Sequence, residues 1–203
     1  MSALRPDLAA IAGLVAPGAR VLDVGCGDGA LLEHLVREKG VTGRGMELSQ
    51  EGVNACVAHG LSVVQGDADL DLADYPSAVF DYVILSETIQ AMRRPKAVLV
   101  EIMRIGVRGI VSLPNFGHWK IRLQLLFSGR MPVTRALDNN WHDTPNVHLC
   151  TIADFAALCA DCGIRIERAM TLSRGRLREI PVNGRAGNLM AETAIFVLTR
   201  LPG

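Results

Sequence analysis

Short apolar runs alternate with longer amphipathic segments along the first half of the chain, and turn-forming residues separate them. The runs have the length and the β-branched character of buried strands. The amphipathic segments carry apolar residues at the three- to four-residue spacing of surface helices. This alternation predicts an α/β fold with a mostly parallel sheet and helices on both faces. We expect strands near residues 19–24, 42–47, 61–65, 80–85 and 107–113, and helices near 8–15, 29–39, 49–58 and 95–104.

The last part of the chain supplies two more predicted strands, Ile164–Leu172 and Thr193–Arg200. They bring the expected sheet to seven strands in a single domain over residues 1–203. An amphipathic helix precedes them, and the sequence Thr151-Ile152-Ala153-Asp154 predicts a capping box at its start. Between the two strands, segment 174–188 is rich in arginine and glycine and predicts an exposed basic turn.

One segment, 115–149, does not fit this scheme. It follows the fifth expected strand, where a minimal α/β fold needs only a short connection. Between His118 and Arg130 the pattern predicts a helix, although strand-like alternation also fits part of it. Such a helix either packs on its own domain or forms a cover over a substrate site or a surface for a partner. Its apolar face consists of Trp119, Leu123, Leu126 and Phe127.

Two histidines, His142 and His148, lie in a polar and aromatic loop near the end of this segment. Loops of this type often carry functional groups, and histidine exchanges protons near neutral pH. An acid–base role and a solvated or simply hydrogen-bonded side chain are both compatible with the sequence.

The composition argues against several classes of protein. With 203 residues, of which 49% are hydrophobic, the chain can form a sizeable core. Basic and acidic residues number 21 each, so the net charge is zero, which argues against a broad nucleic-acid surface. No apolar stretch approaches the roughly 18 residues that span a bilayer, and the N-terminal residues lack the apolar core of a signal peptide. We therefore expect a cytoplasmic protein that binds neither nucleic acid nor membrane.

The five cysteines are an odd number without a disulfide framework. Cys159 and Cys162 form a C-x-x-C pair, which also occurs in zinc and redox sites. They share the apolar face of a predicted helix, however, and no second cysteine pair completes a zinc ribbon. His148 and Cys150 could add ligands, but their spacing is unlike that of a zinc finger. We expect packed, reduced thiols and no metal.

A glycine-rich turn after the first expected strand is the clearest functional signal. An apolar run ends in a cluster of glycines, and a helical pattern follows. A strand, a tight turn and a helix form the first half of a nucleotide-binding unit, in which the glycines let the backbone approach the ligand. The candidate binding residues of this turn are Asp23, Gly25, Cys26, Gly27, Asp28 and Gly29.

The acids in this turn discriminate between two classes of nucleotide. Gly25, Gly27 and Ala30 also match the dinucleotide pattern G-x-G-x-x-G/A. Asp28, however, stands where it can cap the free N–H groups that otherwise bind a pyrophosphate, and Asp23 adds a second negative charge. Two carboxylates repel a diphosphate but suit S-adenosylmethionine, which carries a sulfonium and an ammonium and no phosphate. A helix cap and a strand-end acid without any ligand are the alternative interpretation.

Glu47 ends the second expected strand, 22 residues after Gly25. In Rossmann folds an acid about 20 residues after the glycine turn binds the ribose hydroxyls. Glu47 is therefore the candidate ribose ligand, and a solvated acid at a strand end is the alternative.

The Asp-x-Gly-x-Gly-x-Gly arrangement at 23–29 resembles motif I of the Rossmann-like class I methyltransferases. This resemblance implies S-adenosylmethionine or its product S-adenosylhomocysteine as cofactor. It also implies that an acid after the third strand accepts a hydrogen bond from the adenine amino group, while the next backbone N–H meets a ring nitrogen. Three more aspartates crowd that stretch, so a solvated loop is the alternative there. The further candidate binding residues are Leu48, Asp67, Ala68 and Ser86.

Three further stretches narrow the resemblance to one family. Ser-Glu-Thr-Ile-Gln stands at 86–90, Leu-Pro-Asn-Phe-Gly-His-Trp at 113–119 and Asp-Thr-Pro-Asn at 143–146. With the glycine motif and Glu47 they resemble the MetW family of methionine biosynthesis proteins over nearly the whole chain. Members of this family accompany the homoserine O-acyltransferase MetX and are needed for its activity. The resemblance therefore implies MetX as a partner, and we expect segment 115–149 to contribute to the contact.

Two functions remain open. The chain is either a subunit that binds S-adenosylmethionine or S-adenosylhomocysteine and supports the acyltransferase, or a methyltransferase that acts on a small metabolite. Methyl transfer from a sulfonium requires alignment and desolvation more than a dedicated acid or base, so no catalytic residue is assigned. The Asn/Asp-Pro-Pro-Tyr motif of N-methylating enzymes is missing after the fourth strand. A dehydrogenase of Rossmann type is disfavoured by Asp23 and Asp28.

Overall fold

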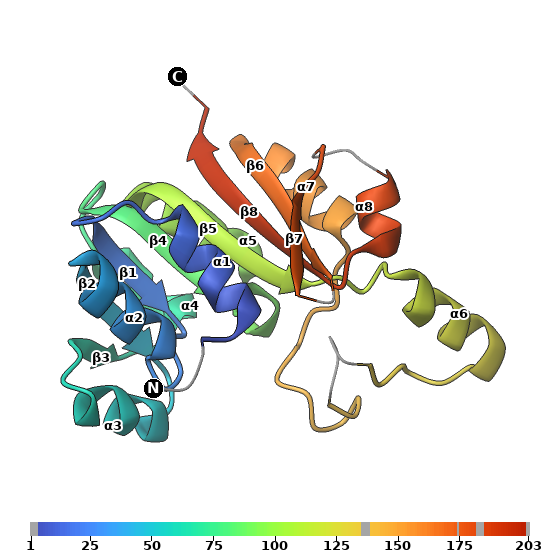
Figure 1. The fold of residues 1–203 in the computed structure, drawn as a ribbon, viewed down its shortest axis with the longest axis horizontal. Coiled ribbons are helices and arrows are strands. Elements are labelled where there is room, and N and C mark those ends of the chain that lie inside the picture. Colours follow the sequence, from blue (N-terminus) through green and yellow to red (C-terminus); the bar gives the residue numbers. More distant parts are fainter. Residues whose placement is uncertain (1–3, 135–138, 174, 182–184, 202–203) are drawn as a thin grey trace.

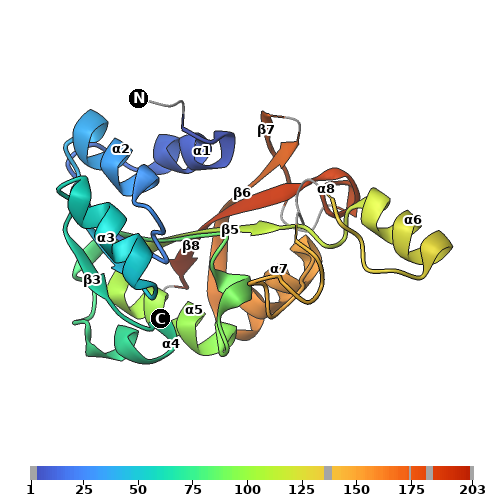
Figure 2. The same ribbon diagram turned by 90° about the horizontal axis from the view of Figure 1, so that it is seen from below.

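The computed structural model of the chain describes residues 4–134, 139–173, 175–181 and 185–201. Within these ranges one eight-stranded sheet lies between two layers of helices (Figure 1 and Figure 2). The strands are β1 (Arg20–Val24), β2 (Thr42–Glu47), β3 (Val63–Gln65), β4 (Phe80–Ser86), β5 (Gly106–Pro114), β6 (Ile164–Ser173), β7 (Arg176–Glu179) and β8 (Thr193–Arg200). The helices are α1 (Pro6–Leu14), α2 (Ala30–Lys39), α3 (Gln50–Ala58), α4 (Ala68–Asp71), α5 (Pro95–Ile105), α6 (Trp119–Ser128), α7 (Ile152–Asp161) and α8 (Arg185–Met190), with the 3₁₀ turns η1 (Leu72–Asp74) and η2 (Ile89–Ala91).

The strand order is β3-β2-β1-β4-β5-β8-β6-β7. Strands β1 to β5 pair in parallel, and β8 enters antiparallel between β5 and β6. The central strands β1 and β4 are buried over most of their length, which explains why most of their residues are apolar. The predicted α/β fold, with a mostly parallel sheet and helices on both faces, is confirmed.

The predicted number of seven strands is wrong, because the connection between β6 and β8 contains regular structure. Within segment 174–188, which the sequence predicted to be an exposed basic turn, Arg176–Glu179 forms β7 and Arg185–Met190 forms α8. β7 pairs antiparallel with β6 and is the edge strand of the sheet. All four of its residues are exposed, so no apolar alternation marks this strand in the sequence. Of the predicted turn, Arg174 and residues 182–184 lie outside the described residues.

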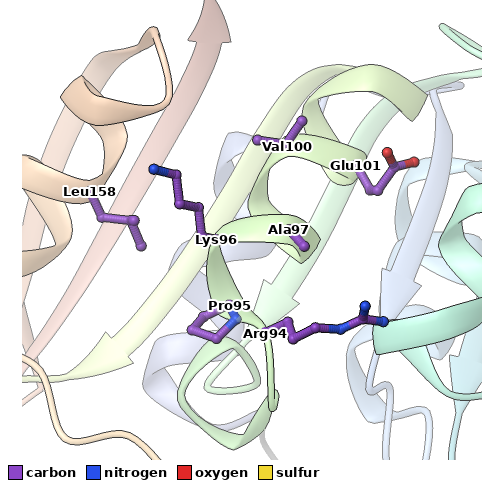
Figure 3. A pocket seen from close by; sticks show the side chains of 7 residues that line it. All are labelled: Arg94, Pro95, Lys96, Ala97, Val100, Glu101 and Leu158. Atoms are coloured by element: carbon purple, nitrogen blue, oxygen red, sulfur yellow. The ribbon is translucent and has the colours of Figure 1, made fainter.

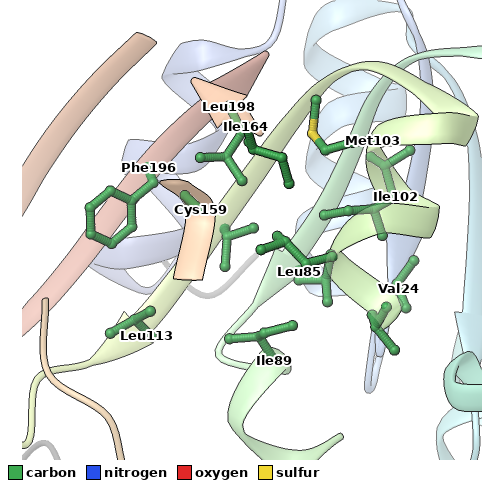
Figure 4. Close-up of a cluster of buried hydrophobic side chains, with 14 of the residues drawn as sticks. Val24, Leu85, Ile89, Ile102, Met103, Leu113, Cys159, Ile164, Phe196 and Leu198 are labelled. Atoms are coloured by element: carbon green, nitrogen blue, oxygen red, sulfur yellow. The ribbon is translucent and has the colours of Figure 1, made fainter. Parts of the chain in front are cut away.

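Apolar side chains fill both sides of the sheet, because successive residues of a strand point to opposite faces. On one face Leu85 of β4 packs with Ile102 of α5 and Cys159 of α7 in the cluster that Figure 4 shows. On the other face Val21 of β1 and Ile84 of β4 pack against α1 and α2. The helices are thus fixed on both faces of the sheet.

Two helices confirm local predictions. In the capping box of α7, Thr151 Oγ1 accepts a hydrogen bond from the Asp154 N–H at 3.2 Å, and Asp154 Oδ2 accepts from the Thr151 N–H at 3.0 Å. The stretch between His118 and Arg130 is helical, not extended, over Trp119–Ser128. This helix, α6, lies beyond the end of β5 at the periphery of the molecule in both views (Figure 1 and Figure 2). No helix within the described ranges is long and apolar enough to cross a membrane.

The packing around Gly29, at the start of α2, gives a first testable prediction. Gly29 has a φ of +82°, and a Cβ there would lie 2.5 Å from Leu61 Cδ1 and 2.8 Å from Cys56 Sγ. We expect Gly29→Ala to lower the free energy of unfolding by about 1–3 kcal/mol, because it combines backbone strain with overpacking. Gly13→Ala is the matched control, since Gly13 is exposed in α1 and no atom lies within 4 Å of its added Cβ.

The control should instead raise the free energy of unfolding, by about 0.5–1 kcal/mol, through the better helix propensity of alanine. Urea unfolding of both variants and the wild type measures the two effects. An unchanged midpoint for Gly29→Ala would contradict the tight packing of the turn.

Candidate functional site

The residues that the sequence singled out for binding lie at one edge of the sheet, where the parallel strands β3, β2, β1 and β4 end side by side. Open α/β sheets bind ligands in the crevice outside the carboxyl ends of their strands. The structure therefore brings all of the predicted residues together at this edge of the sheet. They are Asp23 in β1, Gly25, Cys26, Gly27, Asp28 and Gly29 in the turn after it, Glu47 and Leu48 at the end of β2, Asp67 and Ala68 at the start of α4, and Ser86 at the end of β4.

The glycine turn, residues 25–29, is tightly packed at Gly25 and has open space at Gly27. Gly25, Gly27 and Gly29 all have positive φ angles, between 57° and 82°, which side chains disfavour. A Cβ on Gly25 would lie 2.6 Å from the Cγ2 of Thr88, so the turn is packed against the segment that follows β4. A Cβ on Gly27 would meet no atom within 4 Å. Gly27 is therefore the point at which a ligand can approach the backbone of the turn.

Glu47 connects this turn to the next helix. Its Oε2 accepts from the Gly27 N–H at 2.9 Å, and its Oε1 accepts from the Ser49 N–H and the Ser49 hydroxyl, each at 2.9 Å. Ser49 in turn is the N-cap of α3, where its Oγ accepts from the Gly52 N–H at 3.1 Å. Glu47 is thus not merely a solvated strand-end acid. Leu48, which follows it, is 63% exposed.

Asp23 is a buried carboxyl group with an incomplete set of hydrogen bonds. Its side chain is almost fully buried, and its Oδ1 has no hydrogen-bond partner among the described residues. Burial, together with the nearby charge of Glu47, raises the pKa of Asp23 to about 7. The Oγ of Ser86, at the end of the neighbouring β4, is also buried and has no hydrogen-bond partner within the described ranges. Two polar groups at this edge can therefore still bind a ligand.

Asp28 and the acids after β3 bind backbone N–H groups. Asp28 Oδ1 accepts from the Ala30 N–H at 3.1 Å at the start of α2, as predicted for a helix cap. Asp67 Oδ1 accepts from the Asp69 N–H at 2.9 Å, which caps α4. Asp71 Oδ2 accepts from the Asp67 N–H at 2.7 Å. The solvated-loop interpretation of this stretch does not describe these acids, because they fix the local backbone.

Gln90 lies in the turn that follows β4, and it ends the stretch 86–90 that the sequence comparison singled out without assigning a role to this side chain. Its side chain is almost fully buried, its Nε2 donates to the Glu87 carbonyl at 2.7 Å, and its Oε1 has no partner among the described residues. Its backbone carbonyl accepts from the N–H groups of Val147 and His148, at 3.0 and 2.9 Å. Gln90 therefore ties the end of segment 115–149 to the edge where the candidate site lies.

The histidines and cysteines show no built metal centre. His142 and His148 are both exposed, and the nearest acid to His142 is its neighbour Asp143, at 3.2 Å. No group of three or more potential ligands gathers anywhere in the described part of the chain. Cys159 is buried, and this burial raises the pKa of its thiol to about 12, so the thiol stays protonated.

A cavity of about 540 Å³ between α5 and α7 lies apart from these residues (Figure 3). It is lined mainly by the first turns of α5, with Leu158 of α7 on the opposite side. One of its polar side chains, Arg94, donates to the Asp69 carbonyl. None of the predicted binding residues lines this cavity, so its apolar walls do not mark the candidate site.

Comparison with known proteins gives a family and a fold. The sequence model of one family, described as methionine biosynthesis protein MetW, matches residues 5–198. A bifunctional methionine biosynthesis protein MetXA/MetW of Rhodopirellula baltica is 32% identical over 208 residues, which cover 97% of this chain and 33% of that protein. A ubiquinone biosynthesis O-methyltransferase of Xylella fastidiosa is 31% identical over 160 residues, which cover 74% of this chain and 62% of that protein. The chain thus spans about a third of the fused relative and less than two thirds of the other.

Solved structures of methyltransferases share the fold of the whole chain. A SAM-dependent methyltransferase of Thermotoga maritima, described as a possible histamine N-methyltransferase, superposes with a TM-score of 0.71 at 17% identity, covering 97% of this chain and 88% of that one. A TehB-like SAM-dependent methyltransferase of Corynebacterium glutamicum gives a TM-score of 0.66 at 17% identity, covering 98% and 89%. The predicted Rossmann-like methyltransferase fold is confirmed, with one more strand than expected.

The burial of Asp23 predicts how stability changes with pH. The folded state holds a proton on Asp23 up to a pKa of about 7, whereas an unfolded carboxyl loses it near 3.8. The Asp23 contribution to the free energy of unfolding therefore falls as the pH rises from about 4 to about 7, by at most about 4 kcal/mol. Asp23→Asn cannot ionise, so we expect this variant to gain stability relative to the wild type as the pH rises from 4.5 to 7.5, roughly the same window.

Asp81→Asn is a control for which we expect the opposite effect on stability at neutral pH. Hydrogen bonds from Arg20 lower the pKa of Asp81, so this carboxylate stabilises the fold above its unfolded pKa, and its loss should cost stability at neutral pH. Chemical unfolding at several pH values measures both variants. A difference between Asp23→Asn and wild type that does not change with pH would show that Asp23 titrates normally.

Proposed function

The chain belongs to the MetW family of methionine biosynthesis proteins, and we propose that it is a subunit that binds S-adenosylmethionine or S-adenosylhomocysteine and supports the homoserine O-acyltransferase MetX. The observation that carries the proposal is the relative in which MetXA and MetW form one chain. Two activities joined in one polypeptide work at high effective concentration. A separate MetW chain would obtain the same proximity by docking.

The carboxyl edge of the sheet supports the cofactor part of the proposal. The residues fit a nucleoside that carries positive charge and no phosphate, since Asp28 caps the helix start where a phosphate would bind. Glu47 holds its carboxylate beside the open tip of the turn at Gly27, and carboxylate oxygens can accept further bonds from ribose hydroxyls. Asp67 caps α4 through its Oδ1. Its Oδ2 lies 3.9 Å from Nη2 of Arg93 and can accept a hydrogen bond from a ligand.

Asp23 supports a cationic ligand in particular. When bound, S-adenosylmethionine would supply a sulfonium and an ammonium near these acids. A positive charge near the buried Asp23 would favour its ionised form and lower its pKa from about 7. Asp23 thus destabilises the free protein at neutral pH and is retained, on this proposal, for the ligand.

The exposed face of α6 supports the partner part of the proposal. Of its apolar residues only Ile121 is fully buried, at 1% exposure. Leu126 and Phe127 at the end of the helix are 74% and 81% exposed, so this face does not pack on the rest of the described chain. Large apolar side chains that gather on a surface indicate a protein contact. Segment 115–149 is therefore our proposed contact with the acyltransferase.

A methyltransferase acting on a small metabolite is the second candidate. The observation in its favour is a pair of buried atoms that have no hydrogen-bond partner in the described part of the chain, Ser86 Oγ at the end of β4 and Gln90 Oε1 in the turn after it. An acceptor molecule with hydroxyl or amino groups would satisfy them. Conversion of S-adenosylmethionine to S-adenosylhomocysteine on addition of such an acceptor, and not of the acyltransferase, would favour this function.

Loss of the Glu47 carboxylate tests the cofactor site. We expect Glu47→Ala to weaken binding of S-adenosylmethionine about ten- to a hundredfold, since a lost hydrogen-bond partner of a buried group costs roughly 1–3 kcal/mol. Glu51→Ala is the matched control, because Glu51 is an exposed acid in the first turn of α3. Isothermal titration calorimetry measures both variants.

No wild-type binding at millimolar concentrations of either nucleoside would refute the cofactor assignment. Tighter binding of NAD would instead favour the dehydrogenase interpretation. Equal weakening by Glu47→Ala and Glu51→Ala would show that the effect is not specific to the ribose ligand.

Truncation of the α6 face tests the partner. We expect Phe127→Ala to weaken the complex with the homoserine O-acyltransferase about tenfold or more, since buried aromatic anchors contribute about 2 kcal/mol. Trp119→Ala, at the other end of the face, should act in the same direction. Val57→Ala is the control, because Val57 is an apolar residue that is 60% exposed on α3. Titration of the labelled acyltransferase measures the affinities, and wild-type affinity in both α6 variants would place the contact elsewhere.

A further inference from the structure

A groove with an unusual charge lies beside α6. A cavity of about 970 Å³ opens between the start of α6, the β6–β7 hairpin and α8, and Lys120, Arg176 and Arg178 line it. We call it the basic groove. Arg176 and Arg178 lie on one face of β7, since they are two residues apart in a strand. A second cavity, of about 290 Å³, adjoins the groove, because both are lined by His118, Lys120 and Glu192.

The three cations of the groove have no acidic partners among the described residues. The Nζ of Lys120 lies 5.7 Å from the centroid of the Trp119 ring, which also lines the groove. On the opposite face of the same hairpin, by contrast, Arg168 pairs with Glu179 at 3.0 Å. Since the chain has no net charge, this local excess of positive charge is not a general property of its surface.

The neutral polar side chains of the groove already form hydrogen bonds within the protein. Thr171 Oγ1 donates to the Arg178 carbonyl at 3.4 Å, and Ser173 Oγ donates to the Met190 carbonyl at 3.3 Å. His118 Nδ1 accepts from the Lys120 N–H at 3.3 Å, so in the neutral ring the proton is on Nε2. Among its described lining residues, the three cations Lys120, Arg176 and Arg178 outnumber the single acid Glu192, which already has a partner of its own. The groove therefore offers a ligand mainly cationic donors. Its occupant must therefore supply acceptors, and carboxylates are the strongest of these.

We infer that the basic groove receives an acidic segment of the acyltransferase. The inference rests on the proposed function and extends it from the α6 face to the adjoining hairpin. Trp119 connects the two surfaces, because it belongs to the apolar face and also lines the groove. Apolar and charged contacts would then form one continuous interface, with aromatic residues at its centre and arginines at its rim.

The groove suits a protein segment better than a small anion. Sites for small molecules enclose the ligand and orient it with fixed polar groups. Here the fixed hydroxyls are occupied, and Arg176 and Arg178 are exposed on an edge strand. Long flexible cations at an open rim steer an acidic partner and select it by charge.

Charge reversal in the groove tests the inference. Using the purified chain and its homoserine O-acyltransferase, we expect the double variant Arg176→Glu/Arg178→Glu to weaken binding by about ten- to a hundredfold at low salt. Its affinity should also fall less steeply than that of the wild type over a roughly tenfold rise in salt concentration. The matched control is Lys96→Glu/Arg165→Glu, which changes the net charge equally at two exposed sites outside the groove.

Hydrogen exchange of the wild-type complex gives an independent readout. The amides of β7 and α8 should be protected when the acyltransferase binds. If the groove variant and the control bind alike, or if β7 and α8 exchange as in the free protein, the inference is wrong while the proposed function stands. If the wild type does not bind the acyltransferase at low salt, both are wrong.

Discussion

The carboxylate of Glu47 connects the glycine turn, the end of β2 and the start of α3. It accepts hydrogen bonds from the Gly27 N–H, the Ser49 N–H and the Ser49 hydroxyl. Bonds to an ionised acceptor are stronger than those between neutral groups, so one side chain fixes the turn relative to the next helix. Packing closes the rest of the turn, which leaves Gly27 as its open point. The proposed cofactor edge therefore has its shape before any ligand binds, and little ordering is needed on binding.

Much of the fold could be predicted because its main strands are buried on both faces. Most residues of β1 and β4 are apolar, and the spacing from Gly25 to Glu47 reflects the fixed length of a strand–helix–strand unit. β7 could not be predicted, since all four of its side chains are exposed and no buried face imposes an apolar alternation on its sequence. The burial of Gln90 was equally hidden, because it depends on Val147 and His148, which are distant in sequence.

The acids after β3 show why the roles of single side chains are harder to predict than strands. The sequence suggested that Asp67 either binds a ligand or is solvated. In the structure, these acids instead accept hydrogen bonds from backbone N–H groups of the same stretch. Asp69 goes further, because its two oxygens accept from the N–H groups of Arg93 and Arg94 across the chain, each at 2.8 Å. The geometry of the folded turn decides which N–H groups have no backbone acceptor, and the composition of the stretch does not determine that geometry.

The short strand β7 has a consequence for the molecule when no partner is bound. Without it, the open edge of the sheet would be β6, a ten-residue strand whose backbone could pair with an edge of another copy. With it, the last strand has only four residues, three of them charged. Short, charged edges are poor templates for intermolecular pairing. The hairpin that sequence patterns failed to predict thus protects the sheet from aggregation on the side where Arg176 and Arg178 line the basic groove.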